Sequence, residues 1–229
     1  MKNVLAVIPA RGGSKGLKNK NIKVIAGKPL ISWTIDAALK SKHIDKVIVS
    51  TDSKEIEKIS KEYGASVPFL RPKDLAQDDT SSIDVMLHAV EYFPEYKYII
   101  MLQPTSPLRE CSHIDQAFEF FFKSNMDSCV SVTKDKKTPF WSFSMVNENN
   151  LVSLFPNKEM PSRRQEITST YHLNGAIYIS SILNLKEKKS FITKKTCGYE
   201  MPEEVSIDID DINEFNVASR LLKNTFFKK

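Results

Sequence analysis

Short apolar runs that alternate with amphipathic stretches are the feature that most constrains the fold of this chain. The stretches between the runs carry apolar residues at a spacing of about 3.6, as on one face of a helix. The predicted strands are Val4–Ile8, Val47–Val49, Tyr98–Leu102 and Cys129–Val132, and the predicted helices are Leu30–Leu39, Ile56–Tyr63 and two that are capped by Ser82 and Ser112. Repeated strand–helix units predict an α/β fold with a mostly parallel sheet and helices on both faces.

The regular alternation lapses between residues 134 and 169, within a length that suits a single domain over residues 1–229. Apolar residues such as Trp141, Phe143 and Phe155 alternate weakly there, and Asn149–Asn150 is typical of a turn. An unstructured loop of this length is uncommon in a compact domain. We therefore expect a small β-rich excursion, and because exposed apolar patches often form interfaces, we expect it to contact the partner of a homodimer.

Composition limits the classes of protein to which the chain can belong. The net charge of +5 suits an enzyme with anionic substrates and also a nucleic-acid-binding module. No apolar run approaches the roughly 20 residues of a membrane span, and Pro9 follows the first short run, which is atypical of a signal peptide. We expect a cytoplasmic protein with reduced cysteines and no membrane partner, and a solvated loop at Lys186–Lys189.

A loop rich in glycine and basic residues follows the first predicted strand directly. Its candidate ligand-binding residues are Arg11, Gly12, Gly13, Lys15, Gly16 and Lys20. Glycines let the backbone approach a ligand, and the carboxyl end of a first parallel strand is where such folds bind phosphates. The spacing matches neither a Walker loop nor a dinucleotide-binding glycine motif. A basic surface turn is the alternative, and the pattern favours a polyphosphate site.

Two aspartates near the C-terminus form a candidate metal site. Asp208 and Asp210 are two residues apart at the end of a predicted final strand, so both carboxylates face one side and raise each other's pKa. A divalent cation removes this repulsion, and Mg²⁺ prefers one or two carboxylates together with substrate phosphates. A solvated strand end is the alternative. Asp211 and Glu214 have the spacing of a capping box, so we expect a final helix that begins at Asp211.

Several motifs together resemble one family, the acylneuraminate cytidylyltransferases. They run in the order Ile8–Asn21, Gly27–Leu30, Ser50–Asp52, Leu70–Pro72, Leu102–Arg109, Asn174–Tyr178 and Ile207–Asp210. The resemblance implies a Rossmann-like nucleotidyltransferase fold. It also implies that CTP is joined to a nine-carbon acidic sugar, N-acetylneuraminate or a relative such as legionaminate, to give the CMP-sugar and pyrophosphate.

The resemblance also implies site residues and a cofactor. Mg²⁺, with Mn²⁺ as a substitute, is expected on Asp208 and Asp210. The implied catalytic residues are Arg11, Lys15, Lys20, Asp208 and Asp210; the nucleotide-binding residues are Arg11, Gly12, Gly13, Ser14, Lys15, Lys20, Asn21, Arg71, Thr80 and Ser82; and the sugar-binding residues are Gln103, Arg164, Tyr178 and Phe191.

Two departures from the family pattern concern the sugar pocket. Trp141 stands where better-known members have a lysine, and Phe191–Ile192 stands where they have two adjacent aromatic residues. Both changes make the pocket less polar and favour legionaminate. A cytidylyltransferase for Kdo or pseudaminate is the nearer alternative. We expect no nucleic-acid partner, so a basic nucleic-acid-binding module is the distant alternative. The general base, the number of metals, the choice between Arg163 and Arg164 and the role of His172 stay open.

Overall fold

A six-stranded sheet forms the centre of the protein in the computed structural model, which describes residues 3–147, 149–155 and 169–226. The strand order is β10-β6-β9-β5-β1-β4. The strands are β1 (Val4–Pro9), β4 (Lys46–Ser50), β5 (Tyr98–Met101), β6 (Ser128–Lys134), β9 (Tyr171–Ser181) and β10 (Thr196–Glu200). Strand β1 is parallel to β4 and β5, and β10 is parallel to β6, whereas β9 is antiparallel to both of its neighbours. The mostly parallel sheet is thus confirmed, with one reversed strand.

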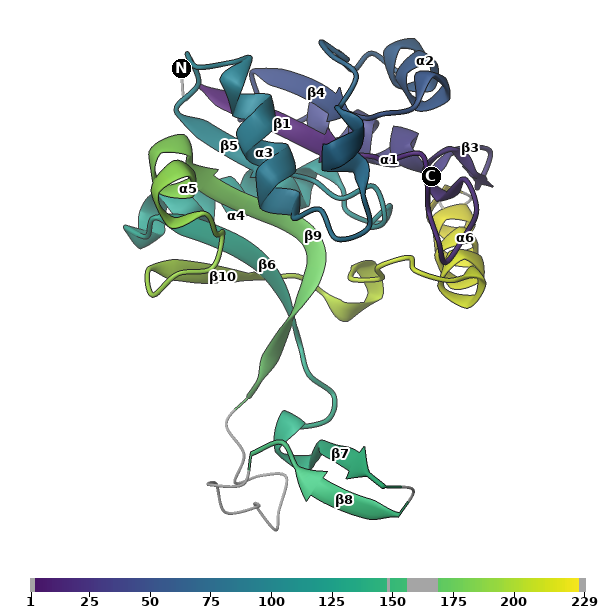
Figure 1. The fold of residues 1–229 in the computed structure, drawn as a ribbon, viewed down its shortest axis with the longest axis vertical. Coiled ribbons are helices and arrows are strands. Elements are labelled where there is room, and N and C mark those ends of the chain that lie inside the picture. Colours follow the sequence, from purple (N-terminus) through teal and green to yellow (C-terminus); the bar gives the residue numbers. More distant parts are fainter. Residues whose placement is uncertain (1–2, 148, 156–168, 227–229) are drawn as a thin grey trace.

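Helices cover both faces of this sheet, as expected (Figure 1). Alternate residues of β1 divide between the two faces, because successive side chains of a strand point in opposite directions. Val4, Ala6 and Ile8 are buried with residues of one set of helices, and Leu5 and Val7 are buried with residues of the other. The first set is α1 (Leu30–Leu39), α2 (Lys54–Glu62) and α4 (Cys111–Ser124), and the second is α3 (Ser82–Glu91) and α5 (Ile182–Lys188).

The last helix, α6 (Ile212–Phe226), belongs to a third apolar cluster beside the sheet. Phe215, Ala218 and Leu222 of α6 are buried there with Ile209 and Leu108. The predicted start of this helix is confirmed. Asp211 Oδ1 accepts a 2.9 Å hydrogen bond from the Glu214 amide, and Glu214 Oε2 accepts a 3.2 Å bond from the Asp211 amide. These reciprocal bonds are the capping box that the sequence pattern indicates.

Shorter elements complete the chain. They are η1 (Lys20–Ile22), β2 (Val24–Ile25), β3 (Lys28–Pro29), η2 (Lys73–Ala76) and η5 (Glu203–Val205). One of them, η1, carries Lys20 and Asn21. No helix among the described residues is long and apolar enough to cross a membrane.

The excursion is β-rich in the part that the structure describes. Strands β6 and β9 run on beyond the sheet, and between them β7 (Phe143–Val146) and β8 (Asn150–Ser153) form an antiparallel hairpin after η3 (Pro139–Trp141) (Figure 1). Met145 is 67% exposed and Leu151 is 57% exposed, so the hairpin presents apolar side chains to its surroundings. Residues 156–168 lie outside the described residues, and the role of the excursion in a dimer stays a prediction.

The predicted final strand near Asp208 is wrong. Strand β10 ends at Glu200, and Pro202, which has no amide hydrogen to continue a ladder, precedes the short helix η5. The segment around Asp208 is instead held outside the sheet by Ile209, whose buried side chain packs beside α6 and whose amide donates a 2.9 Å bond to the carbonyl of Thr105.

Three local predictions also need correction. Ser81, not Ser82, caps α3, because its side chain accepts a bond from the Ile83 amide. Glu110, not Ser112, caps α4, in a capping box with His113. The basic run at residues 186–189 is the exposed last turn of α5 and its C-cap rather than a loop.

Candidate active site

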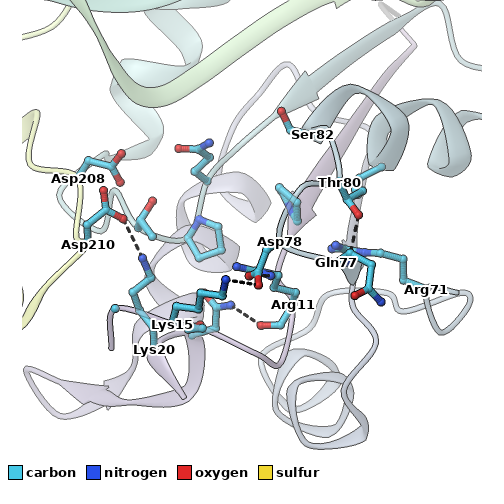
Figure 2. A pocket seen from close by; sticks show the side chains of 18 residues that line it. Arg11, Lys15, Lys20, Arg71, Gln77, Asp78, Thr80, Ser82, Asp208 and Asp210 are labelled. Carbon is cyan, nitrogen blue, oxygen red and sulfur yellow. Dashed lines mark hydrogen bonds and ion pairs between the residues drawn. The ribbon is translucent and has the colours of Figure 1, made fainter. Parts of the chain in front are cut away.

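A cavity of about 580 Å³ lies at the carboxyl ends of β1 and β5 (Figure 2). It brings together most of the residues that the sequence singled out, from four separate stretches of the chain. Those that line it are Arg11, Ser14, Lys15, Lys20, Asn21, Arg71, Thr80, Ser82, Gln103, Asp208 and Asp210. Gly12, Gly13, Tyr178 and Phe191 are not among the lining residues, and Arg164, like Arg163, lies outside the described part of the chain.

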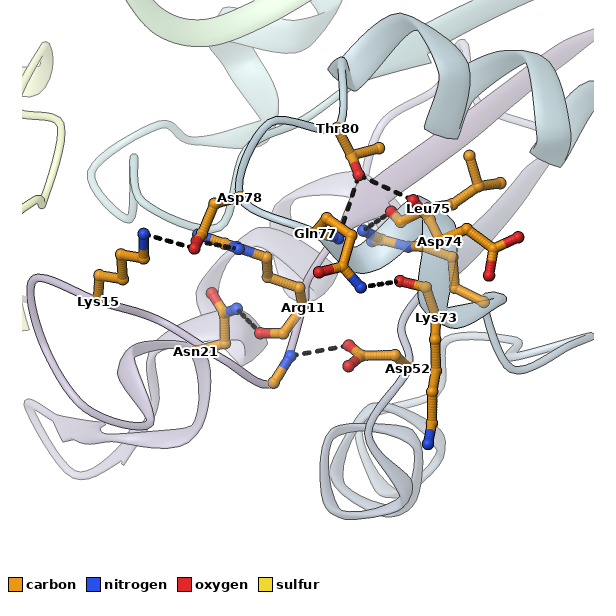
Figure 3. Close-up of polar contacts among 12 residues, drawn as sticks. Arg11, Lys15, Asn21, Asp52, Lys73, Asp74, Leu75, Gln77, Asp78 and Thr80 are labelled. Carbon is orange, nitrogen blue, oxygen red and sulfur yellow. Dashed lines mark hydrogen bonds and ion pairs between the residues drawn. The ribbon is translucent and has the colours of Figure 1, made fainter.

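The basic loop after β1 meets acidic side chains from neighbouring segments (Figure 3). Arg11 Nη1 lies 2.6 Å from Asp78 Oδ1, and Lys15 Nζ lies 2.5 Å from Asp78 Oδ2. Hydrogen bonds from Lys15 and Arg11 lower the pKa of the Asp78 carboxyl. The Gly12 amide donates a 2.9 Å bond to Asp52 Oδ1, so this amide points to a carboxylate rather than into the cavity.

Asn21 and Arg71 fix the walls on the same side of the cavity. Asn21 is buried, and its side-chain Nδ2 donates a 3.0 Å hydrogen bond to the carbonyl of Arg11, which holds the start of the loop. The buried Arg71 donates to Ser50 Oγ at 3.1 Å, to the Ser50 carbonyl and to the Leu75 carbonyl at 3.3 Å. Burial lowers the pKa of Arg71 to about 10, so the group stays a cation at neutral pH.

The remaining residues on this wall, Thr80 and Ser82, lie in the turn before α3 and at the first position of that helix. Thr80 Oγ1 donates to the Asp74 carbonyl and accepts from the Gln77 amide, both at 3.1 Å, which gives the turn its shape (Figure 3). Because Ser81 supplies the cap of α3, the Ser82 hydroxyl is not used for capping, and Ser82 lines the cavity (Figure 2).

On the opposite side, Lys20 joins the basic loop to the acidic segment. Its Nζ donates to the Ile209 carbonyl at 2.6 Å and to Asp210 Oδ1 at 3.1 Å. Gly16 packs against the same segment, since a Cβ at this position would lie 2.5 Å from the Asp210 carbonyl oxygen. The cationic loop and the two carboxylates therefore line one cavity, and Lys20 and Asp210 join them through a direct contact.

Asp208 is the half-buried member of the carboxylate pair, and Asp210 is the exposed one. Burial raises the pKa of the Asp208 carboxyl, and the nearby charge of Asp210 adds to the rise. Its Oδ1 atom is buried and has no hydrogen-bond partner in the described structure. An orphaned anionic oxygen beside a second carboxylate fits a divalent cation whose other ligands come from a substrate and water. Among the described residues no cluster of three or more metal-binding side chains occurs, so the pair would need those outside ligands.

Gly175 makes the close approach of Asp208 and Gln103 possible. Its φ of +73° lies in the left-handed region, and a Cβ here would be 2.7 Å from Gln103 Oε1 and 2.9 Å from Asp208 Oδ2. A side chain at position 175 would therefore displace the ends of Gln103 and Asp208. Strand β9 thus supplies a gap into which the amide and the carboxylate both fit.

Arg109 supports the turn that carries Gln103. Its Nη1 donates to the Gln103 carbonyl at 3.1 Å and to the Ala176 carbonyl at 2.9 Å. The side chain is 1% exposed, and its Nε and Nη2 atoms have no partner in the described structure. Burial lowers the pKa of Arg109 to about 9. An uncompensated buried cation is costly, so its retention is explained by the two carbonyls that it holds in place.

The predicted sugar contacts are less well placed. Phe191 is 4% exposed and lies in the apolar core with α3 and α5, away from the residues that line the cavity. Tyr178 is half-buried against it, with the ring centroids 5.6 Å apart, and burial raises the pKa of the tyrosine. Trp141 and Ile192 are exposed, and His172 Nδ1 lies 2.6 Å from Asp135 Oδ1 at the base of the excursion.

Four residues at this site were not predicted as site residues, although Asp52, Arg109 and Gly175 lie within the family motifs Ser50–Asp52, Leu102–Arg109 and Asn174–Tyr178. Asp52 follows β4, and its position after a buried parallel strand was a further signal. Asp78 lies in none of these motifs, and its contacts with Arg11 and Lys15 join residues far apart in the chain.

Comparison with known proteins shows that this chain is similar to cytidylyltransferases over most of its length. Residues 5–225 match the family model described as cytidylyltransferase. An N-acylneuraminate cytidylyltransferase of Escherichia coli is 39% identical over 216 residues, which are 94% of this chain and 51% of the relative. A CMP-N,N'-diacetyllegionaminic acid synthase of Legionella pneumophila is 39% identical over 227 residues, and the match covers 96% of each chain. The chain therefore spans about half the length of the first relative and nearly all of the second.

A solved structure with the same architecture is a CMP-2-keto-3-deoxy-manno-octonic acid synthetase complexed with CTP. It superimposes with a TM-score of 0.71 at 18% identity, over 97% of this chain and 99% of that one. The similarity confirms the nucleotidyltransferase fold that was expected from the sequence.

Proposed function

Since the chain belongs to the cytidylyltransferase family, we propose that it is a nucleotidyltransferase that joins CTP to a nine-carbon acidic sugar and releases pyrophosphate. One observation carries the proposal. The cationic loop and the carboxylate pair Asp208 and Asp210 line the same cavity, and Asp208 contributes an anionic oxygen without a partner. Transfer of a nucleotidyl group needs both features, because the leaving group is a polyanion and the attacked phosphorus is shielded by negative charge.

In the proposed reaction the anomeric 2-hydroxyl of the sugar attacks the α-phosphorus of CTP, the bond to the β-phosphate breaks, and pyrophosphate leaves. Arg11, Lys15 and Lys20 stabilise the charge that develops on the departing pyrophosphate. Asp208 and Asp210 are the residues that would hold a divalent cation. Mg²⁺, or Mn²⁺ in its place, supplies charge neutralisation and lowers the pKa of the attacking hydroxyl.

Nucleotide recognition is assigned to the wall opposite the acidic pair. Arg71 is held by hydrogen bonds to Ser50 and Leu75 and lines the cavity. Together with Thr80 and Ser82 it is proposed to read the cytosine, while Asn21 holds the Arg11 carbonyl. Rigid donors of this kind discriminate between bases, because a base that leaves them unpaired pays the cost of desolvation.

The sugar is assigned to the side of the cavity that carries Gln103, with Tyr178 and Arg164 as further candidates. The excursion projects away from the central sheet of its own chain (Figure 1). In the proposed dimer, Trp141 approaches the sugar site of the second copy. We therefore include a homodimer in the proposal, with the hairpin of one protomer near the sugar site of the other. Light scattering tests it, and a fully active stable monomer contradicts it.

Legionaminate is our proposed sugar, accepted at least as well as N-acetylneuraminate. It carries an acylamino group and a methyl group where N-acetylneuraminate has hydroxyls. These less polar groups suit the apolar side chains of Trp141 and Ile192, which make the predicted sugar pocket less polar than in the better-known family members. Phe191 plays no part in this argument because it is buried. The measurement is kcat/KM for both sugars at saturating CTP. A preference for N-acetylneuraminate of about tenfold or more, on the order of 1.4 kcal/mol, contradicts the assignment.

Pyrophosphate release from CTP with a panel of sugars tests the function itself. Release that depends on N-acetylneuraminate or legionaminate supports the proposal, whereas release with Kdo or pseudaminate alone moves it to another acidic sugar. Absence of sugar-dependent release, together with salt-sensitive binding of nucleic acid, would favour the basic-module alternative.

A further inference from the structure

Asp78 places both of its carboxylate oxygens on the two cations of the phosphate loop. Oδ1 lies 2.6 Å from Arg11 Nη1 and Oδ2 lies 2.5 Å from Lys15 Nζ (Figure 2). Two oxygens on one centre that bridge two cations are also the arrangement with which a phosphate group binds such a pair. A phosphate oxygen that binds these cations in the same manner has to replace the carboxylate.

The segment that carries Asp78 is braced by its own contacts. Thr80 Oγ1 is bonded to the Asp74 carbonyl and the Gln77 amide, and the Gln77 side chain donates a 2.7 Å bond to the Lys73 carbonyl (Figure 3). These bonds do not involve Asp78. The carboxylate can therefore leave Arg11 and Lys15 while the turn keeps its shape.

The two ion pairs have the properties of a contact that is easily exchanged. The side chain of Asp78 is 45% exposed and that of Lys15 is 76% exposed. Exposed ion pairs contribute little to stability and weaken with salt. A single carboxylate charge cannot hold the cations against a polyphosphate, but it lowers the apparent affinity of every anion that uses them, because the fraction of protein with free cations is reduced.

We propose that Asp78 is an intramolecular competitor for the polyphosphate of the nucleotide. Binding of the triphosphate displaces Asp78 from Arg11 and Lys15, and its return to these cations helps pyrophosphate to leave. No bond other than hydrogen bonds and ion pairs changes in this exchange. The inference rests on the proposed function for the identity of the nucleotide, but the competition itself concerns any polyphosphate.

The opposite role is that Asp78 holds Arg11 and Lys15 in the geometry that phosphates need. The two roles predict opposite effects of Asp78→Asn, which keeps the shape of the side chain and removes its charge. Loss of a competitor makes anions bind more tightly, whereas loss of a positioning group makes them bind more weakly.

Asp79→Asn is a matched control, because Asp79 is the exposed neighbour and its replacement removes the same charge from the same turn. Calorimetric titrations of the wild type and both variants use three probes, namely CTP, inorganic pyrophosphate and cytidine. Cytidine has no phosphate and does not need Arg11 or Lys15. Thermal melting of each variant checks that the fold is retained.

For Asp78→Asn we expect CTP and pyrophosphate to bind about three- to tenfold more tightly than to the wild type, with cytidine unchanged. Asp79→Asn is expected to change each affinity by less than about twofold. The gain should shrink at high salt, because salt weakens the competing ion pairs. Pyrophosphate should also inhibit turnover of Asp78→Asn more strongly.

Equal or weaker binding of pyrophosphate by Asp78→Asn, relative to Asp79→Asn, overturns the inference. A gain that cytidine shares equally also overturns it, because the effect is then not located at the phosphate cations. If the wild type binds pyrophosphate but not CTP, the proposed nucleotide is wrong, and the pyrophosphate titrations still decide the role of Asp78. If the wild type binds neither anion, both proposals fail.

Discussion

Lys20 of the phosphate loop donates a 3.1 Å hydrogen bond from Nζ to Oδ1 of Asp210, a residue 190 positions further along the chain. The lysine side chain is 14% exposed, while that of Asp210 is 80% exposed, so a sheltered cation meets an accessible carboxylate. The same ammonium group binds the Ile209 carbonyl. This contact is the point at which the two chemically distinct halves of the cavity are joined.

Lys20→Met should lower kcat/KM for pyrophosphate release by roughly 100-fold, because a positioned charge beside the reacting phosphates is lost. Lys18→Met is the matched control, since Lys18 is an exposed lysine of the same loop, and it should stay within about twofold of the wild type. Steady-state kinetics at saturating Mg²⁺ measure both variants. Retention of half or more of the wild-type kcat/KM by Lys20→Met would show that its charge is not used.

Asp208→Asn should abolish activity and yet stabilise the fold near neutral pH. Burial raises the pKa of Asp208 above its ordinary value of 3.8, so the folded state favours the protonated carboxyl. The contribution of this group to stability is therefore fully present below pH 3.8 and is lost as the pH rises through the raised pKa. Asparagine avoids that loss, and the gain at pH 7 should be on the order of 1 kcal/mol, or about 2–4 °C in Tm.

Melting curves of Asp208→Asn between pH 4 and pH 8 provide the test, in the absence of divalent ions. The advantage over the wild type should shrink toward pH 4, and Mg²⁺ should raise the Tm of the wild type more than that of the variant. Asp210→Asn is the control, because its exposed side chain predicts little change in Tm and a large loss of turnover. A variant that is less stable than the wild type at pH 7 contradicts the burial argument.

Gly175→Ala should damage both stability and activity. The φ of +73° is unfavourable for alanine, and the added Cβ would also displace the ends of two site side chains, because Gln103 Oε1 and Asp208 Oδ2 lie less than 3.0 Å from it. We expect a loss of roughly 1–3 kcal/mol in the free energy of unfolding. Chemical denaturation measures it. Gly13→Ala serves as the stability control, because nothing lies within 4 Å of a Cβ at that position, and an equal loss there would remove the steric explanation.

Arg109→Met should impair the use of the sugar but not the binding of CTP. The variant loses the bonds to the carbonyls of Gln103 and Ala176, which shape the proposed sugar side, while the contacts of Arg71 remain. We expect kcat/KM for the sugar to fall by about tenfold or more and the Kd of CTP to change by less than about twofold. Phe118→Leu, a core change in α4, controls for general destabilisation. Parallel loss of CTP binding in Arg109→Met would mean that Arg109 acts only through the fold.

The sequence by itself determined the helices and strands, and the presence of helices on both faces of the sheet, because that information is local. The 3.6-residue and continuous apolar patterns depend on neighbours in the chain, and β1, α1, β4 and β5 lie where these patterns place them. Glycine and basic residues after the first strand likewise indicated the phosphate side of the cavity, because the carboxyl end of a parallel strand is a binding position in any such sheet.

The tertiary structure alone decided the relations between distant residues. The reversal of β9, the burial of Phe191 and the departure of Asp208 from the sheet follow from which surfaces pack together. The bonds of Lys20 to Asp210 and of Asp78 to Arg11 and Lys15 join residues whose spacing in the chain carries no periodic signal. A sequence pattern fixes which side chains share a face, whereas the free energy of packing fixes which faces meet, and the cavity exists where they meet.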